Sequence, residues 1–465
     1  MRRSPVSVLL VFVVGLVVAG CAGYQPRPVV GRDVLRDLQQ IRLDALGPAT
    51  SPRQPDDARP SAFDPNDGLS ADEAVAAALF LNPDLRAFRK ERGIAEGEFV
   101  AAGLLPNPQL QVTWLFIQRF TKSLGTSGWD VGVSWSPPRP GERQAKLARA
   151  QARIEEVRAQ VAAEEWRLAT DVRKSYAALW AAGERLRLID ASVALQARLR
   201  RLMREKLDAG DANRLDMNLV ELDYAERLRE QVAIRNDRER ARLVLNRLLG
   251  LPPATEVALQ DVGDLLVYRR WDLRPSVLEA TMVDQREDLK AAGQEYEQAE
   301  QALRVAYIQR LPWFSFGPAY QRNPEDEHVN GFGIGLSIDL PVVNLNQGEI
   351  ARLEAARDKL REGFVAKVHG ARAEVSEGLE SLRAQERLVR LYEDTVAPAL
   401  AESARLADAS LELGDFTALQ FVSAQDKSLK ARRDGIEAGL EYWKAIFELE
   451  RALGARLADV EGKQE

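Results

Sequence analysis

Hydrophobic residues recur every seven positions over two very long stretches of the chain. Residues 142–208 contain no proline and hold two such series, the second shifted by four: Leu147, Ile154, Val161 and Leu168, then Val172, Leu179, Leu186 and Val193. The second stretch keeps the step in Val368, Val375, Leu382, Val389 and Val396, with Pro398 predicting a local kink near its end. Sustained heptads indicate coiled-coil helices, and the shift is a stutter. At 1.5 Å per residue, the first stretch predicts a rod of about 100 Å.

Two other regions alternate between apolar and polar or very small residues with a period of two. In 107–120 the apolar series is Leu110, Val112, Trp114 and Phe116, and in 129–136 it is Trp129, Val131, Val133 and Trp135. In 330–340 it is Phe332, Ile334, Leu336 and Ile338, which alternate with Gly331, Gly333, Gly335, Ser337 and Asp339. The pattern predicts strands of about 10 residues, a length that also suits a tilted strand crossing a membrane.

The alternation alone leaves two interpretations open. A soluble hairpin with one face on a core is the more common source of such a pattern. Two hairpins, however, give only four strands, and their open edges are not tolerated inside a bilayer. If these strands cross a membrane, several chains must therefore build one barrel together.

Landmarks in the first half of the chain recur about 204 residues later, in the same order. The pairs include Asn82-Pro83-Asp84-Leu85 with Arg286-Glu287-Asp288-Leu289, Gly210-Asp211 with Gly414-Asp415, and Leu249-Gly250 with Leu453-Gly454. Each half is predicted as a helix, two strands, a very long helix, a break and a shorter helix. The opening helices are predicted over 70–103, with a Ser70–Glu73 capping box, and over 275–311. We divide the chain into 1–20, 21–67, a first repeat at 68–260, a second repeat at 261–454, and a tail at 455–465.

The first residues have the composition of a bacterial signal peptide. Arg2 and Arg3 precede an apolar run over 6–18 that is too short to span a bilayer. Val18-Ala19-Gly20-Cys21 then resembles a lipobox, which predicts cleavage before Cys21 and a covalent lipid, such as palmitate, on its thiol; the alternative is a chance cysteine. Ala22 favours the outer membrane over retention in the inner one. Residues 24–67 are rich in Pro, Arg and Asp and predict an extended leader.

Composition excludes several classes of function. The net charge is −6, without a basic patch that interleaves with aromatics, so we expect no nucleic-acid partner. One cysteine and two histidines allow neither an internal disulfide nor a Cys/His zinc cluster, so no metal site is predicted. Acidic residues lie on helices among Arg and Lys, as on solvated faces. There is no P-loop, GxSxG or HExxH motif, and we expect neither an enzyme nor a cofactor beyond the lipid.

Three segments carry a resemblance to a known family: LNPDLRAF (81–88), AAGLLPNPQL (101–110) and GIGLSIDLPVVNLNQGEIARLEAARDKL (333–360). Together with the duplication and the order of elements, they resemble the outer membrane efflux proteins, the TolC-like channels, over about residues 68–454. The segment around Asn344, Asn346, Gln347, Gly348 and Glu349 is similar to the branch that serves heavy-metal cation pumps of the RND type. The first repeat departs there, because it has Pro137-Pro138-Arg139-Pro140-Gly141 and four fewer residues.

The resemblance implies a mainly α fold with a β-barrel part. A homotrimer would close a twelve-stranded outer-membrane barrel, and its long helices would continue as an α-barrel in the periplasm. The implied partners are a periplasmic adaptor, an inner-membrane pump that is usually proton-driven, and outer-membrane lipid. The implied function is a passive exit duct, with metal cations as a candidate cargo. An exit duct for type I protein secretion and a lipid-anchored coiled-coil scaffold without a pore are the alternatives.

The helix breaks would then lie at the periplasmic tip. Gly210 and Gly414 are expected to end the descending helices, and Asp211 and Asp415 to cap the ascending ones. The resemblance places acidic constriction residues shortly after each glycine, which gives Asp216 and Gln420, six residues after each. Asp211 and Asp415 are predicted to belong to the same constriction. For Asp216, plain helix capping is the alternative role. Leu207, Leu215 and Leu419 are candidate adaptor contacts, with ordinary helix packing as their alternative.

Overall fold

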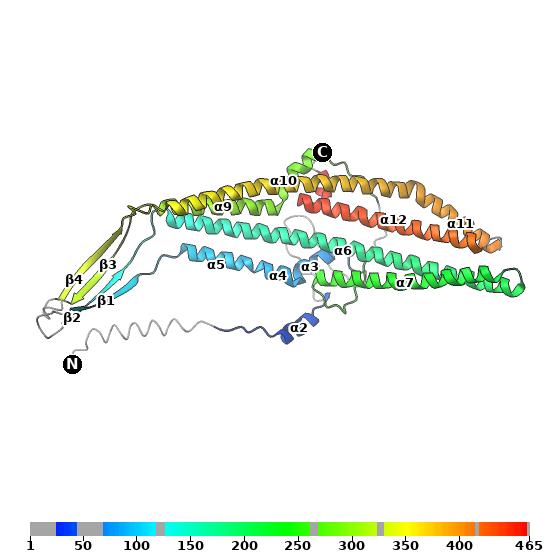
Figure 1. Ribbon diagram of the computed structural model, residues 1–465, viewed down its shortest axis with the longest axis horizontal. Helices are drawn as coiled ribbons and strands as arrows, with labels where there is room; N and C mark the ends of the chain where they lie inside the picture. Colours follow the sequence, from blue (N-terminus) through cyan, green and yellow to red (C-terminus); the bar gives the residue numbers. More distant parts are fainter. Residues whose placement is uncertain are drawn as a thin grey trace.

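The computed structural model describes residues 25–43, 68–117, 126–260, 268–322, 330–413 and 418–462. After α2 (Gly31–Gln39), the first half consists of α3 (Ala71–Leu81), α4 (Pro83–Arg89), α5 (Glu91–Gly103), β1 (Gln109–Ile117), β2 (Thr126–Ser134), α6 (Glu142–Ala209) and α7 (Arg214–Leu249). The second half consists of α8 (Pro275–Gln285), α9 (Glu287–Ile308), β3 (Trp313–Arg322), β4 (Asn330–Asp339), α10 (Gln347–Leu391), a π turn η2 (Tyr392–Val396), α11 (Ala397–Leu413), α12 (Ala418–Leu453) and α13 (Leu457–Glu461). The molecule is a long helical body with the strands at one end (Figure 1).

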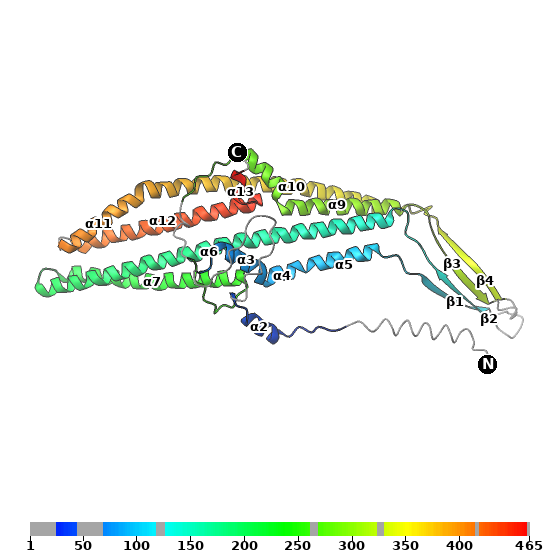
Figure 2. The same cartoon turned by 180° about the vertical axis from the view of Figure 1, so that it is seen from behind.

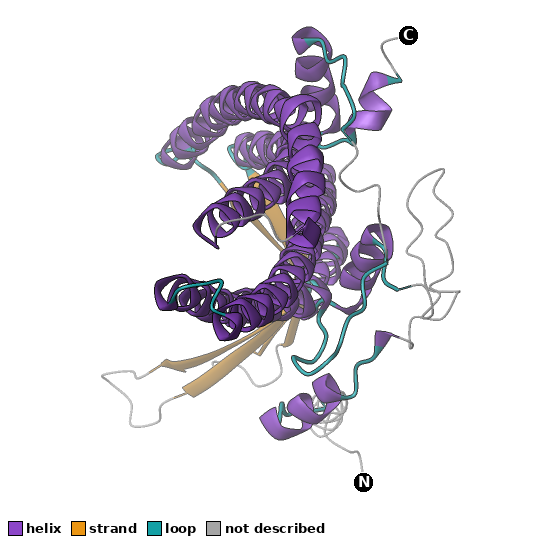
Figure 3. Ribbon diagram, turned by 90° about the vertical axis from the view of Figure 1, so that its right-hand side faces the viewer, coloured by secondary structure: helices purple, strands orange, loops and turns teal. Residues whose placement is uncertain are grey.

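The two halves repeat the same elements at the predicted spacing. The starts of α3 and α8 at Ala71 and Pro275 are 204 residues apart, and so are the ends of α7 and α12 at Leu249 and Leu453. Viewed along the long axis, the helices of both halves follow one curved arc (Figure 3). The second view of the cartoon shows the two halves running side by side along the body (Figure 2).

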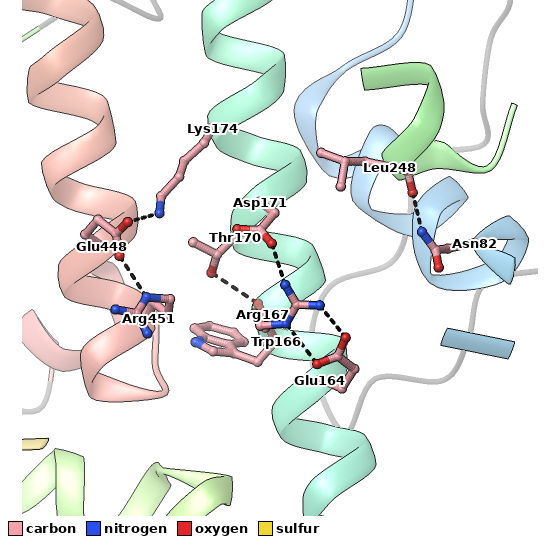
Figure 4. Close-up of polar contacts among 10 residues, drawn as sticks. All are labelled: Asn82, Glu164, Trp166, Arg167, Thr170, Asp171, Lys174, Leu248, Glu448 and Arg451. Atoms are coloured by element: carbon pink, nitrogen blue, oxygen red, sulfur yellow. Dashed lines mark hydrogen bonds and ion pairs between the residues drawn. The ribbon is translucent and has the colours of Figure 1, made fainter. Parts of the chain in front are cut away.

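The opening helices are divided, whereas the sequence predicts one continuous helix in each half. Ser70 and Glu73 form the predicted capping box. The chain then breaks at Asn82, whose side chain accepts the Leu85 N–H at 2.9 Å and donates to the Leu248 carbonyl at 2.9 Å (Figure 4). Pro83 occupies the first position of α4, where its missing N–H costs no hydrogen bond. In the second half the corresponding break is at Arg286, between α8 and α9.

The first long helix confirms the heptad prediction. α6 runs without interruption for 68 residues, against the predicted 142–208. Val161, Leu168, Val172 and Leu179 of the heptad series are all buried. The second long helix differs, because η2 and α11 follow its 45 residues of α10. The change of path before Pro398 agrees with the predicted kink and is visible as a bend (Figure 1).

The core is concentrated about halfway along the body. One hydrophobic cluster joins α3, α6 and α7 with the loop after α7, and its counterpart joins α8, α10, α12 and α13. Tyr176 lies in the first cluster, and its hydroxyl donates to the Leu69 carbonyl at 2.8 Å. Burial raises the pKa of Tyr176 to about 12, so that the hydroxyl keeps its proton at neutral pH.

Ion pairs connect the two halves across this arc. Lys174 of α6 pairs with Glu448 of α12, and Glu448 also accepts from Arg451 at 2.8 Å (Figure 4). The Trp166 indole of α6 donates to the Glu450 carbonyl of α12 at 3.3 Å. Polar contacts between residues nearly 300 positions apart therefore supplement the hydrophobic core.

The four strands form one antiparallel sheet in the order β1-β2-β3-β4. Each hairpin is fully paired, from Gln109↔Ser134 to Ile117↔Thr126 and from Trp313↔Asp339 to Arg322↔Asn330. The hairpins join through a short ladder, Trp129↔Arg322 to Gly132↔Ala319, and a bridge between Trp135 and Phe316. Pro318 lies between the ladder and the bridge, where it has no N–H to donate.

Candidate membrane sheet and tip turn

One face of the sheet is apolar and largely exposed. It carries Leu110, Val112 and Trp114 of β1, Val133 of β2, Phe314 and Phe316 of β3, and Phe332, Ile334, Leu336 and Ile338 of β4. Phe332 is 78% exposed and Ile334 is 80% exposed. A contiguous exposed apolar surface of this kind marks a site of contact with lipid or with another protein.

The opposite face carries mainly small and polar residues. The pairing places Gln111 beside Gly132, Ser315 beside Ser337, and Ala319 beside Gly333. Both faces follow from the alternation in the sequence, and pairs such as Leu110↔Val133, Val112↔Val131 and Phe316↔Leu336 place apolar residues side by side. The predicted strand positions and their two faces are therefore present in the structure, and no core covers the apolar face within the described residues.

The turn at the far end of α6 has the geometry expected for a helix that ends at glycine. Gly210 has φ +87°, and the N–H groups of Gly210 and Asp211 donate to the carbonyls of Leu207 and Lys206 at 3.1 and 2.8 Å. This is the Schellman arrangement, in which glycine avoids the steric cost of a left-handed backbone. The predicted role of Gly210 as a helix end is confirmed.

The residue that caps the following helix is Asn213, so the assignment of a capping role to Asp211 is wrong. The Asn213 side chain accepts the Asp216 N–H at 2.8 Å, and α7 begins at Arg214. Asp211 is already used in the Schellman turn and lies too early to reach this amide. Asp211 is the first polar residue after the glycine, but Asn213 is an equally good cap by residue type.

Asp216 is half-buried and lies in the first turn of α7. A carboxylate there is favoured by the helix dipole, which is worth about 0.3–1 kcal/mol at an exposed site. Among the described residues, its carboxylate makes no ion pair. The geometry is thus compatible with a local role in the helix start and leaves the negative charge available at the tip.

The other candidate residues, at the tip and at the predicted lipidation site, separate into three groups. Leu207 packs partly against the cluster formed by Leu199, Met203, Met217, Val220 and Phe421, whereas Leu215 is 68% exposed. Gln420 is exposed and lies near the start of α12. Gly414, Asp415, the Leu419 side chain and Cys21 lie outside what the structure describes, so their predicted roles remain predictions.

A charged layer further up the hairpins was missed by sequence reasoning. Arg227 of α7 is 8% exposed and pairs with Asp223, with Glu230 and with Asp426 of α12. Glu230 also pairs with Arg433 of α12. Glu230 and Arg433 lie 203 residues apart in sequence. No local pattern signals such a contact.

The arginines decide the ionisation of Glu230. Burial opposes its negative charge, but the hydrogen bond from Arg433 and the charges of Arg433 and Arg227 outweigh this effect. The pKa of Glu230 is therefore lowered. The carboxylate is ionised at neutral pH and joins the first-half hairpin to the second.

Two properties of the described residues bear on the kind of site. None of the described helices is long and apolar enough to cross a bilayer. No group of three or more His, Cys, Asp or Glu side chains in the described part of the chain is arranged to hold a metal ion.

Long helical hairpins joined to one four-stranded sheet with a bare apolar face define a mainly helical protein with a β part. The family model for outer membrane efflux proteins matches residues 74–251 and 281–455, which fall in the two halves of the chain. The chain therefore belongs to the outer membrane efflux protein family. No curated protein sequence matches it.

Solved structures of outer-membrane channels share the fold at low sequence identity. The outer-membrane channel OprN has a TM-score of 0.69 and 18% identity, over 83% of this chain and 90% of that one. CusC has a TM-score of 0.68 and 17% identity, over 94% of this chain and 99% of that one. VceC from Vibrio cholerae has a TM-score of 0.67 and 16% identity, over 83% and 96% of the two chains.

Proposed function

We propose that three copies of this chain form an outer-membrane exit duct for a tripartite efflux system. The observation that carries the proposal is the four-stranded sheet, whose apolar face is bare and whose outer strands β1 and β4 have open edges. Three such sheets would close a twelve-stranded barrel and leave no unpaired edge in the bilayer. The curved arc of helices would continue the barrel into the periplasm (Figure 3).

The partners in this proposal are a periplasmic adaptor and a proton-driven inner-membrane pump. The adaptor would dock at the tip, where the exposed Leu215 side chain is the candidate contact in the described structure. Leu207 is the weaker candidate, because it already packs partly within its own chain. The duct itself would supply a path and no chemistry.

Metal cations are the cargo class that we propose, with organic compounds and secreted proteins as alternatives. Three Asp216 carboxylates around one axis would attract cations and repel anions at the entrance. The equivalent position in the second half holds Gln420, so the ring carries fewer negative charges than two acidic positions per chain would give.

We also propose that Cys21 carries the lipid that tethers the leader to the outer membrane. Its support is the sequence Val18-Ala19-Gly20-Cys21 after an apolar run. Each buried CH₂ of an acyl chain adds about 0.8 kcal/mol of membrane affinity. Metabolic labelling with a palmitate analogue should mark the wild type, and the label should be absent from Cys21→Ser.

Purification in detergent followed by reconstitution tests the duct. The wild type should run as a heat-modifiable trimer and conduct ions across a planar bilayer. Asp216→Asn should reduce the preference for cations, measured as the reversal potential in a salt gradient, and should weaken block by divalent cations. Asp237→Asn, which removes an exposed charge paired with Arg240 higher on the same helix, is the matched control.

The outcomes separate the alternatives. A monomer that does not conduct would reject the duct and favour the lipid-anchored scaffold. A conducting trimer in which Asp216→Asn behaves like Asp237→Asn would keep the duct and remove Asp216 from its entrance.

A further inference from the structure

The short helix α2 presents apolar side chains that the described part of its own chain does not cover. Val34 is 44% exposed and Leu35 is 56% exposed, and α2 has no buried residue. The charged pair Asp33–Arg36 lies on the opposite side of the helix, with its atoms 3.2 Å apart. An amphipathic helix with a free apolar side is incomplete as a packing unit.

α2 is held at one edge of the body by the residues that follow it. Ile41 and Leu43 pack against the hydrophobic cluster of α3, α6 and α7. Figures 1 and 2 show α2 beyond α3 and α4, with the first half between it and the elements of the second half. The free side of α2 is therefore at the edge of the chain rather than over its middle.

The membrane is too distant to cover this helix. The cluster that anchors Ile41 contains Leu168, which is 26 residues after α6 begins at Glu142 beside the sheet. That separation corresponds to about 40 Å of helix. An interfacial helix enters the headgroup region by only about 5–10 Å. The remaining possibility is that another protein surface covers the apolar side of α2.

The second half offers a matching surface at the same level of the body. Leu79 of α3 is 7% exposed, within the cluster against which Ile41 and Leu43 pack. Its counterpart in α8 is Val283, 204 residues later, and this side chain is 50% exposed. The duplicated position is thus covered in the first half and uncovered in the second.

Charge agrees with this match. Arg32 lies next to the apolar side of α2, and Asp284 follows Val283 in α8. Both side chains are exposed, and neither makes an ion pair with another described residue. A contact that joins Val34 and Leu35 to Val283 would also bring charges of opposite sign to its rim.

We propose that α2 packs on α8 of an adjacent copy of this chain, with Val34 and Leu35 against Val283. The inference rests on the proposed ring of three copies, in which first and second halves alternate around the axis. In such a ring, the outer edge of one copy's first half faces the second half of the next copy. α2 then acts as a strap that joins neighbouring copies halfway along the duct.

Disulfide crosslinking in the full-length protein in membranes tests the contact. Val34→Cys with Val283→Cys should give covalent dimers and trimers on non-reducing denaturing gels, whereas each single variant should remain monomeric. Co-expression of the two single variants with different tags should give only a mixed dimer. A disulfide within one chain, or dimers of Val34→Cys alone, would overturn the proposed partner surface.

A second measurement asks whether the strap stabilises the ring. Val34→Ser with Leu35→Ser should lower the temperature at which the trimer dissociates in detergent, and Asp33→Ser with Arg36→Ser on the opposite side should not. A conducting trimer with no crosslink and no such shift would reject the strap and leave the duct intact. A chain that forms no trimer would reject the duct itself, and the strap with it.

Discussion

At the scale of single residues, two glycines make the same close contact in the two halves. Gly250 ends α7 with φ +76°, and a Cβ there would lie 2.8 Å from the Leu81 carbonyl oxygen. Gly454 ends α12 with φ +71°, and its Cβ would lie 3.1 Å from the Gln285 backbone. The end of α7 therefore rests on the end of α3, and the end of α12 rests on the end of α8.

We expect Gly250→Ala to destabilise the protein by about 1–3 kcal/mol, because it adds a clash to a strained left-handed backbone. The matched control is Gly93→Ala in α5, where a Cβ meets nothing within 4 Å. That change should be neutral or stabilise by about 0.5–1 kcal/mol. Loss of the helical circular dichroism signal on heating measures both, and equal melting temperatures for the two variants would contradict the contact.

At the scale of elements, one long helix is continuous and the other is interrupted. α6 is continuous, whereas the second half changes register at η2, where the Ala397 N–H donates to the Tyr392 carbonyl five residues earlier. Pro398 follows directly and has no N–H for the Asp394 carbonyl, which explains why the α-helical register is not kept. The Tyr392 ring lies against Gly435 of α12, and a Cβ at that position would have to displace the ring.

The contacts between hairpins define the next prediction. Glu230 has a lowered pKa, so its contribution to stability is complete above its ordinary pKa of about 4.3 and is lost as pH falls through the lower folded value. Glu230→Gln should lower the melting temperature at neutral pH, at a cost of about 1–2 kcal/mol. The difference from the wild type should shrink as the pH falls below about 4.

The control for this prediction is Glu226→Gln, on the same helix. Glu226 is 62% exposed, and within the described parts of the chain its one ion-pair partner is Arg229 of the same helix, at 3.6 Å. The Glu226→Gln substitution should change the melting temperature little at any pH, since exposed pairs contribute about 0–1 kcal/mol. If the decrease in melting temperature caused by Glu230→Gln stayed constant down to pH 3, packing rather than charge would account for the effect of the substitution.

Some of these elements could be predicted from the sequence, and others could not. Periodicity predicted α6 and the alternation in β1, β2 and β4, because each pattern reflects one side of an element buried or paired along its length. It did not predict the break at Asn82, whose cause includes a hydrogen bond to Leu248, 166 residues away.

In the candidate site, too, features with a local cause could be predicted and features with a long-range cause could not. The turn at Gly210 was predictable because its cause is local. The Glu230–Arg433 contact was not, because two repeats must first align before these residues meet. α2 was also missed, since the leader was read from its average composition rather than from its nine helical residues.

At the scale of the whole molecule, the sheet determines where the chain can reside. Its apolar face has no cover in the described structure, and in the proposed duct that cover is lipid. Neighbouring residues of β4 face opposite sides, with Leu336 on the apolar face and Ser337 on the small-residue face. One strand therefore provides a matched pair of positions.

Leu336→Lys should prevent stable insertion, because a lysine on the lipid face costs about 2–4 kcal/mol near the bilayer centre and every copy would carry it. Ser337→Lys should still insert, since its side chain would project into the lumen, and should lower the preference for cations. Membrane fractionation and heat-modifiability measure insertion. Equal yields of inserted trimer for the two variants would contradict the assignment of the faces.

The open edges of β1 and β4 have a consequence for biogenesis. A single copy in water would expose two rows of unpaired backbone groups beside an apolar face, which is a template for aggregation. The helical body packs within one chain, whereas in the proposed duct the sheet gains its last partners only from other copies. We therefore expect a newly exported chain to need escort through the periplasm, and its maturation to slow steeply as expression falls, because three chains must meet before any of them is complete.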